Sequence, residues 1–277
     1  HVADHVTTAA YEDEAALRAF GEAVDDITYE FENVPTSALD LLGALTPIHP
    51  GREALRISQD RITEKDFLNG LGLSVAPYAA VDDATSMQAA IEQVGVPSIL
   101  KTRRFGYDGK GQARLMSAAD ADKVLADMAG APSVLEGFID FSCEISVIAA
   151  RSPSGEVACY DPGENVHEGG ILRKTTVPAN VKSALRMDAV LLAARILNEL
   201  NYVGVMGVEL FVTQAGLIVN EIAPRVHNSG HWTQNGCTVD QFEQHIRAIA
   251  GWPLGNGQRH SDVVMENLIG DDMERVP

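Results

Sequence analysis

The segment GVELFVTQAGLIVNEIAPR, residues 207–225, constrains the fold more than any other part of the sequence. It predicts two short strands joined by a tight turn, with one glutamate on each strand. We expect residues 214–216 to form a three-residue hairpin loop, because Gly216 accepts the left-handed backbone that its last position needs. Counting outward from this loop places Glu209 opposite Glu221, with both carboxylates on one face.

Two like charges that face each other destabilise a hairpin, so a compensating group is expected near Glu209 and Glu221. A bound divalent cation would serve, because Mg²⁺ takes carboxylate and amide oxygens and leaves room for phosphate oxygens. Asn220 could supply the amide oxygen. Alternatively, a two-residue loop would move Glu221 to the other face and leave two unrelated surface glutamates. The spacing alone leaves both interpretations open.

Charge and cysteine content narrow the class of protein. Lys plus Arg number 21 against 39 for Asp plus Glu, a formal charge of -18, which argues against nucleic-acid or membrane-surface binding. No stretch is apolar for long enough to predict a transmembrane span, and the first residues lack the features of a signal peptide. Cys143, Cys159 and Cys237 are widely separated, which predicts neither a disulfide framework nor a zinc site and suits a reducing cytoplasm.

Hydrophobic periodicity and end signals predict an alternation of helices and strands. Helices are expected over residues 12–21, 37–45, 58–71, 85–94, 118–128 and 181–200. Strands are expected over 26–31, 75–81, 98–101, 112–116, 133–139, 144–150 and 157–160, besides the hairpin. Strand–helix alternation mixed with antiparallel hairpins predicts an α+β catalytic unit attached to an α/β remnant.

A glycine-rich loop, RRFGYDGKGQ, separates two of the predicted strands at residues 103–112. Its glycines let backbone N–H groups approach an anion, and Lys110 adds positive charge. It is not a Walker A motif, because no Ser or Thr follows the lysine and no helix begins there. The loop is therefore either a phosphate-covering flap or a mobile hairpin tip with solvated charges.

Several charged residues lie at the ends of predicted strands. Lys101 ends an apolar strand, so its ammonium group is expected at the edge of a cleft. Glu136 ends one strand and Glu144 begins the next, where they could hold a purine nucleotide or simply face solvent. Glu30 and Glu32 alternate onto one face of their strand and could meet an amine-bearing ligand or water.

A dense polar run follows the second strand of the opening hairpin, and loops at strand ends are where binding groups collect. The run contains Arg225, His227, Asn228, Ser229 and His231. His227 and His231 have the spacing of a helical zinc pair, but the glycine between them makes a helix unfavourable and no third ligand is evident. We therefore do not expect zinc there.

Five motifs together closely resemble the N5-carboxyaminoimidazole ribonucleotide synthetases of purine biosynthesis, which are ATP-grasp enzymes. They are TYEFENVP (28–35), QDRITEK (59–65), FGYDGKGQ (105–112), ENVHEGGIL (164–172) and NEIAPRVHNSGHWT (220–233). The resemblance extends over nearly the whole chain. It implies an ATP-grasp fold, α+β combined with α/β, with a partial Rossmann-like N-terminal domain.

The resemblance also implies domain boundaries. Residues 1–52 would form the C-terminal part of a Rossmann-like pre-ATP-grasp domain, and 53–254 the ATP-grasp domain, with subdomains at about 53–135 and 136–254. Residues 255–277 would begin a small C-terminal domain. The family opens with a strand and a GxGQLG-type turn that precede the part of the family matched here, so we expect a longer protein.

In this family, ATP and bicarbonate form carboxyphosphate, and the amine of aminoimidazole ribonucleotide is then carboxylated, with release of ADP and phosphate. The resemblance implies ATP contacts by Arg61, Lys101, Gly106, Tyr107, Asp108, Gly109, Lys110, Gly111, Gln112, Glu136, Gly137, Phe138, Ile139, Glu144, His167, Asn220 and Glu221. It implies Mg²⁺ on Glu209 and Glu221, and ribonucleotide and bicarbonate contacts by Glu30, Tyr107, Arg225, His227, Asn228 and Ser229. Arg225, His227 and Lys101 would be catalytic.

Two other functions compete with this one. Another ATP-grasp ligase would share the metal-binding hairpin but should lack the HNSGHW run. A nucleotide-binding module without turnover would bind MgADP and release no product. The family further suggests a cytoplasmic homodimer that acts on small molecules, with neither nucleic acid nor membrane as a partner.

Overall fold

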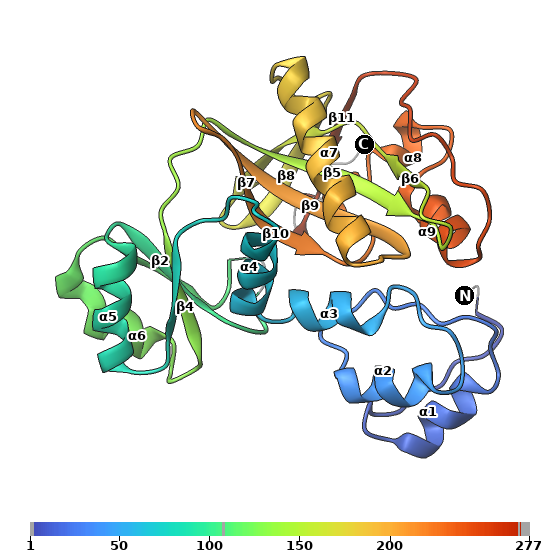
Figure 1. Cartoon of the computed structure of the whole chain (residues 1–277), viewed down its shortest axis with the longest axis horizontal. Helices are drawn as coiled ribbons and strands as arrows, with labels where there is room; N and C mark the ends of the chain where they lie inside the picture. Colours follow the sequence, from blue (N-terminus) through green and yellow to red (C-terminus); the bar gives the residue numbers. More distant parts are fainter. Residues whose placement is uncertain (1–2, 107–108, 271, 273–277) are drawn as a thin grey trace.

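Two antiparallel sheets organise most of the chain (Figure 1). The computed structural model describes residues 3–106, 109–270 and 272. The four-stranded sheet has the order β1 (Tyr78–Val81), β4 (Ser133–Gly137), β2 (Ser98–Thr102) and β3 (Gln112–Leu115). The larger sheet has the order β10 (Gly216–Ala223), β9 (Gly204–Thr213), β5 (Cys143–Arg151), β7 (Gly163–Glu168), β8 (Ile171–Val177) and β11 (Val263–Glu266), and β6 (Val157–Cys159) pairs with β5.

The helices fall into groups around these sheets (Figure 1). The N-terminal unit contains α1 (Glu14–Gly21), α2 (Thr36–Gly43) and α3 (Arg52–Ser58), while α5 (Ala84–Val94), α6 (Ala121–Asp127) and η1 (Ala118–Asp120) pack on the four-stranded sheet. The larger sheet carries α7 (Ser183–Glu199), η2 (Asn228–Gly230), α8 (Thr233–Gly236) and α9 (Gln241–Ile249). α4 (Arg61–Gly70) contacts both sheets, through β1 and β10. None of the helices in the described part of the chain is both long and apolar enough to cross a membrane.

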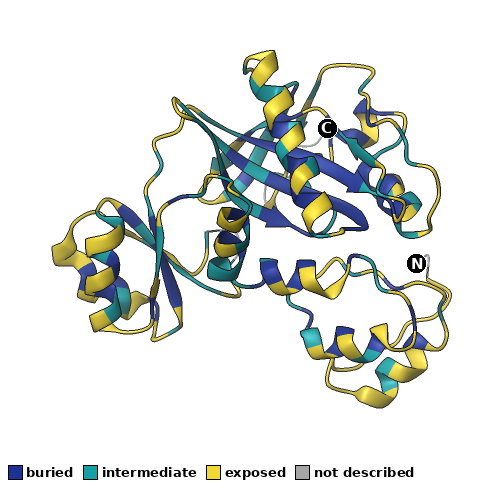
Figure 2. Ribbon diagram, viewed as in Figure 1, coloured by how far each residue is buried: buried dark blue, intermediate teal, exposed yellow. Residues whose placement is uncertain are grey.

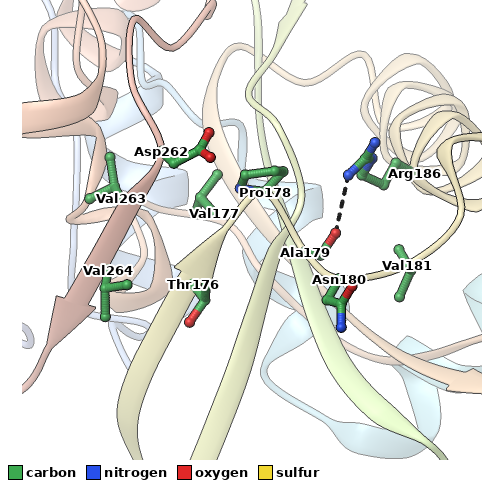
Figure 3. Close-up of a pocket in the computed structure, with 10 residues that line it drawn as sticks. All are labelled: Thr176, Val177, Pro178, Ala179, Asn180, Val181, Arg186, Asp262, Val263 and Val264. Atoms are coloured by element: carbon green, nitrogen blue, oxygen red, sulfur yellow. Dashed lines mark hydrogen bonds between the residues drawn. The ribbon is translucent and has the colours of Figure 1, made fainter.

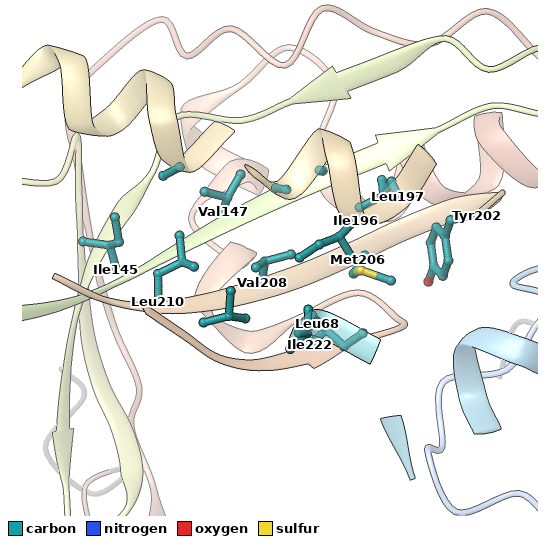
Figure 4. Close-up of a cluster of buried hydrophobic side chains, with 14 of the residues drawn as sticks. Leu68, Ile145, Val147, Ile196, Leu197, Tyr202, Met206, Val208, Leu210 and Ile222 are labelled. Atoms are coloured by element: carbon teal, nitrogen blue, oxygen red, sulfur yellow. The ribbon is translucent and has the colours of Figure 1, made fainter. Parts of the chain in front are cut away.

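Each sheet has its own apolar core, visible as the buried layers in Figure 2. In the larger core, Ile196 of α7 packs over Val208 and the other inward side chains of β5, β9 and β10 (Figure 4). In the smaller core, Met87 of α5 and Leu100 of β2 are almost completely buried. The molecule therefore places two independently packed sheets on either side of α4.

The elements differ from the prediction in places. The strand expected over 26–31 is reduced to one parallel bridge between Ile27 and Ile48. The helix expected over 58–71 is present as α4 but begins at Arg61, because the Asp60 side chain accepts hydrogen bonds from the N–H groups of Ile62 and Thr63; α3 before it was not predicted. The prediction also missed β7, β8 and β11, of which β11 joins the larger sheet beside β8.

Candidate active site

The turn of the β9–β10 hairpin differs from the prediction. Thr213 pairs with Gly216, so only two residues, Gln214 and Ala215, form the turn. The Thr213 hydroxyl accepts from the Ala215 N–H at 3.2 Å and donates to the Gly216 carbonyl at 2.9 Å. Gly216 does take a positive φ, at 127°, but as the first residue of β10. The three-residue loop was therefore wrong.

A β-bulge nevertheless brings the two glutamates level. The ladder runs from Thr213 opposite Gly216 to Leu210 opposite Val219, and its register then shifts so that Glu209 pairs with Glu221. An extra residue on one strand moves every later side chain to the opposite face, which reverses the effect of the shorter turn. The predicted facing pair is confirmed, although its cause is the bulge and not the loop.

The paired carboxylates differ in their electrostatic surroundings. Burial and repulsion from Glu221 raise the pKa of Glu209 to about 7. Burial also opposes ionisation of Glu221, but the positive charges of Arg61 and Lys101 outweigh it and lower the pKa of Glu221. The Asn220 side-chain amide donates to Glu209 at 3.3 Å. One acid is thus held ionised while its neighbour is poised to ionise when a cation arrives.

Helix α4 supplies three side chains to this region from one face. Arg61 Nη1 lies 3.4 Å from Glu221 Oε2, and the Glu64 carboxylate accepts a 2.6 Å hydrogen bond from the backbone N–H of Ile222. Lys65 Nζ lies 3.4 Å from Glu136 Oε1 in the smaller sheet. Sequence reasoning missed Glu64 and Lys65, although their spacing of three and four residues from Arg61 places all three on one side of a helix.

Buried Glu64 and Glu136 respond differently to their neighbours. Burial and the nearby Glu221 raise the pKa of Glu64 to about 8. Burial opposes ionisation of Glu136 as well, but Lys101 and Lys65 overcome this effect and lower its pKa. Lys101 Nζ lies 2.8 Å from the Glu136 carboxylate. Glu136 is 4% exposed, so the alternative that it faces solvent was wrong.

The glycine-rich loop between β2 and β3 is tied down at its first residues. Arg103 Nη2 lies 2.8 Å from Asp60 Oδ2, and Arg104 donates to the Gln59 side chain at 2.8 Å. Both arginines therefore reach the junction of α3 and α4. Gly106, Gly109, Lys110 and Gly111 lie in the described part of this loop, and Gln112 begins β3, whereas Tyr107 and Asp108 lie outside the described residues.

The far end of this loop approaches the turn between β7 and β8. A Cβ atom added to Gly109 would lie 2.9 Å from the carbonyl oxygen of Gly169. In the larger sheet, His167 of β7 contacts the carboxylate of Glu144 of β5, and this contact raises the pKa of His167. The structure thus brings the two sheets together around the predicted nucleotide residues. Gly137, Phe138 and Ile139 lie at the end of β4 and just beyond it, where the chain passes from the smaller sheet to the larger.

The polar run after β10 folds back over β9. His227 Nε2 lies 3.7 Å from Glu209 Oε1, and its Nδ1 lies 2.8 Å from the Ser229 hydroxyl. Burial and the charge of Arg225 lower the pKa of His227 to about 4, so the ring is neutral at physiological pH. The Asn228 side-chain oxygen is buried without a hydrogen-bond partner.

The N-terminal unit reaches the same loop through Glu32. Arg225 Nε lies 3.0 Å from Glu32 Oε1, whereas Glu30 is exposed. Burial is the main cause of a raised pKa at Glu32, with Arg225 acting against it. Sequence analysis placed both acids on one strand face and chose Glu30 for the site. The alternation that motivated this choice is absent because residues 28–31 are not a strand.

Glu209 and Glu221 offer oxygen ligands of the kind that bind a hard cation. No group of three or more His, Cys, Asp or Glu residues in the described ranges is arranged to hold a metal ion. Two carboxylates and an amide nevertheless suit Mg²⁺, which keeps most of its remaining positions for water and substrate phosphates. Burial, and then repulsion from Glu221, raise the pKa of Glu209, and a bound cation would act against both effects. Glu209, Asn220 and Glu221 therefore fit such an ion.

A separate open groove of about 360 Å³ lies beside β8 and β11, at the opposite end of the larger sheet from β10 (Figure 3). Arg186 and Asp262 are its charged residues, and the Arg186 guanidinium donates to the Ala179 carbonyl at 3.2 Å. The groove shares no residue with the acid pair or with the polar run after β10.

Comparison with known proteins places the chain in a family. An ATP-grasp domain matches residues 66–242, and a ribonucleotide synthetase preATP-grasp domain matches residues 1–59. N5-carboxyaminoimidazole ribonucleotide synthase from Brucella melitensis is 54% identical over 279 residues, covering 100% of this chain and 77% of the relative.

Two solved structures share the fold and carry ligands. N5-carboxyaminoimidazole synthetase from Staphylococcus aureus, complexed with ADP, has a TM-score of 0.92 at 37% identity, over 97% of this chain and 72% of that one. N5-carboxyaminoimidazole synthase from Aspergillus clavatus, with ADP and 5-aminoimidazole ribonucleotide, has a TM-score of 0.90 at 30% identity, over 97% and 72% respectively.

Proposed function

The chain belongs to the N5-carboxyaminoimidazole ribonucleotide synthase family of ATP-grasp ligases, and from this premise we propose how its residues divide the reaction. Its function is ATP-dependent synthesis of N5-carboxyaminoimidazole ribonucleotide from 5-aminoimidazole ribonucleotide, in purine biosynthesis. The observation that carries the residue assignment is the pairing of Glu209 with Glu221 beside Arg61. We further propose a cytoplasmic homodimer.

Glu209, Asn220 and Glu221 are the residues that would hold Mg²⁺. When bound, the ion would neutralise charge on the phosphate oxygens of ATP. Arg61 and Lys101 carry positive charge toward Glu221, so they are suited to the same phosphates. Glu144 and His167, together with Gly137, Phe138 and Ile139, would contact the remainder of the nucleotide where the chain crosses between the sheets.

The reaction is proposed to proceed in two steps. A bicarbonate oxygen bonds to the γ-phosphorus of ATP while the bond to the β-phosphate oxygen breaks, which gives carboxyphosphate and ADP. The substrate amine then bonds to the carboxyl carbon, phosphate leaves, and the nitrogen loses one proton. Gly106, Tyr107, Asp108, Gly109, Lys110, Gly111 and Gln112 would cover the site and exclude water, to which carboxyphosphate is sensitive.

The polar run after β10 is proposed to bind bicarbonate and the ribonucleotide. Arg225 would stabilise the developing negative charge on the carboxyphosphate oxygens. Neutral His227 has a ring nitrogen available to accept a proton near Glu209. Asn228 and Ser229 follow on η2, and Glu30 and Tyr107 complete the substrate contacts.

The assignment is tested first by substrate dependence. Release of ADP should require 5-aminoimidazole ribonucleotide and bicarbonate together, and replacing the amine by glycinamide ribonucleotide should stop it. Equal ATP hydrolysis with either substrate omitted would contradict the proposal. Binding of MgADP without turnover would instead indicate a nucleotide-binding module.

Arg225→Ala separates the two halves of the site. Because Arg225 pairs with Glu32 and not with the acid pair, MgADP binding should stay within about twofold of the wild type. Carboxylation should fall by roughly a hundredfold or more, as expected when one oxyanion donor is lost. Calorimetry with MgADP and a coupled ADP-release assay measure the two effects, and a parallel loss of both would contradict this division.

A further inference from the structure

The bulge in β10 is held by contacts from outside the sheet. β10 is an edge strand of the larger sheet, and on its outer side Val219 forms an isolated parallel bridge with Val75. The N–H of Val219 donates to the backbone carbonyl of Ser74 at 2.8 Å. The N–H of Ile222 donates to the carboxylate of Glu64 at 2.6 Å. These two hydrogen bonds lie on either side of the position at which the register shifts.

Of the two acceptors, Glu64 contributes a side-chain oxygen and Ser74 a backbone carbonyl oxygen. It is 3% exposed, and Ile222 is 4% exposed, so water cannot readily replace the hydrogen bond between them. Arg61 lies one turn earlier on the same helix and reaches Glu221. Helix α4 therefore contacts both the carboxylate of Glu221 and the backbone immediately after it.

We propose that Glu64 is a positioning residue for Glu221, through the hydrogen bond that fixes the β10 bulge. This inference rests on the proposed Mg²⁺ site. Without the bulge, the two-residue turn would place Asn220 opposite Glu209 and direct Glu221 to the other face of the sheet. Glu64 thereby decides which residue completes the metal site, although it does not itself contact the ion.

Variants of α4 test the inference against a purely structural role. Glu64→Gln keeps an oxygen that accepts from Ile222, whereas Glu64→Met keeps the size and loses the acceptor. Leu68→Ala is the control for lost packing, because Leu68 is fully buried on the same helix, belongs to the apolar cluster that also contains Val219 and Ile222 (Figure 4), and has no polar side-chain atom. For each variant, calorimetry gives the Mg²⁺ concentration that half-saturates ADP binding, deuterium exchange follows the β10 amides, and thermal unfolding reports stability.

Loss of one buried hydrogen bond predicts that Glu64→Met needs roughly tenfold more Mg²⁺ and exchanges the Ile222 amide roughly tenfold faster. Glu64→Gln should restore both values to within about twofold, since it restores the acceptor. Leu68→Ala should lower the melting temperature and leave the Mg²⁺ requirement unchanged.

Three outcomes would overturn the inference. Unchanged Mg²⁺ dependence in Glu64→Met would show that the bulge does not need Glu64, and equal impairment in Glu64→Gln would show that charge, not the acceptor, matters. If the Mg²⁺ requirement rises in Leu68→Ala as much as in Glu64→Met, lost stability alone would explain the result for Glu64→Met. If the wild type binds ADP independently of Mg²⁺, the proposed metal site itself fails, and that result is distinct from the others.

Discussion

Two hairpins border the candidate site, and they are built differently. The β9–β10 hairpin has a two-residue turn, and its site residues are fixed by side-chain contacts from α4 and from the loop after β10. The β2–β3 hairpin has a long loop in which Gly109 and Gly111 take φ values of 74° and 68°. The acidic side of the site is therefore set by packing, and the basic side by backbone conformations that favour glycine.

Glu221→Gln should have the largest effect on the acidic side, because it removes the negative charge proposed to hold Mg²⁺. ADP binding in the presence of Mg²⁺ should weaken by roughly a hundredfold or more, beyond what loss of an outer contact costs. Glu156→Gln, an exposed acid between β5 and β6, provides the matched control. If Glu221→Gln binds ADP in the presence of Mg²⁺ as tightly as the wild type in isothermal calorimetry, Glu221 does not hold the metal ion.

Without Mg²⁺, the acidic hairpin should also make stability depend on pH. Glu209 has its pKa raised from 4.5 to about 7, so the folded state binds more protons than the unfolded state between these values. The contribution of Glu209 to stability is then greatest below about pH 4.5 and falls as the pH rises through about 7, by on the order of 3 kcal/mol at most.

Glu209→Gln should remove this decline, because its amide carries no charge. In urea unfolding with EDTA present, the variant should have a larger free energy of unfolding than the wild type at pH 8. At pH 5 the two proteins should be closer in stability. Added Mg²⁺ should stabilise only the wild type at pH 8. A variant less stable than the wild type at pH 8 in EDTA would contradict the predicted repulsion.

Gly111→Ala tests the basic side of the site, where the conformation of the β2–β3 loop depends on glycine. An added Cβ would lie 2.6 Å from the Thr102 hydroxyl, in a residue already at positive φ. Such strain should reduce kcat/KM for ATP by roughly tenfold. Gly130→Ala is the matched control, since Gly130 has a φ of 76° and no atom within 4 Å of its added Cβ. Equal kinetic losses in both variants would mean that the loop has no special geometry.

Gly216→Ala should have the smallest effect. Its φ of 127° disfavours a side chain, but no atom lies within 4 Å of the added Cβ. We expect a loss of about 1 kcal/mol in the free energy of unfolding. The Mg²⁺ dependence should not change, because the bulge and not the turn aligns the glutamates. A large change in Mg²⁺ dependence would show that the turn, and not the bulge, aligns Glu209 with Glu221.

Much of the site could be predicted from local patterns. The apolar strand that ends in Lys101, the glycines of the 103–112 loop and the polar run after β10 are all properties of neighbouring residues, and their motifs sufficed for the family. The pairing of Glu209 with Glu221 was one of two interpretations that the spacing left open, and the structure has it. Its cause was not predicted, because the bulge leaves no pattern in the neighbouring residues.

The partners of the buried charges could not be predicted in the same way. Glu64 contacts Ile222 across 158 positions, and Arg225 reaches Glu32 in the N-terminal unit. Glu64, Arg225 and Glu32 are all of residue types that usually face solvent, so the sequence gives no sign that they are buried. Their ionisation depends on burial and on which opposite charge lies within a few ångströms, and neither is a property of neighbouring residues.

The sequence by itself determined the kinds of element, the motifs and therefore the chemistry available to the chain, because helix ends, strand patterns and glycine-rich loops follow from adjacent residues. Tertiary structure alone decided the register at Asn220, the role of α4 between the sheets and the pKa values of the buried acids. The physical reason is that a bulge, a buried charge and the helix packed against them join residues far apart in the sequence, whereas helix ends and strand patterns depend on neighbouring residues.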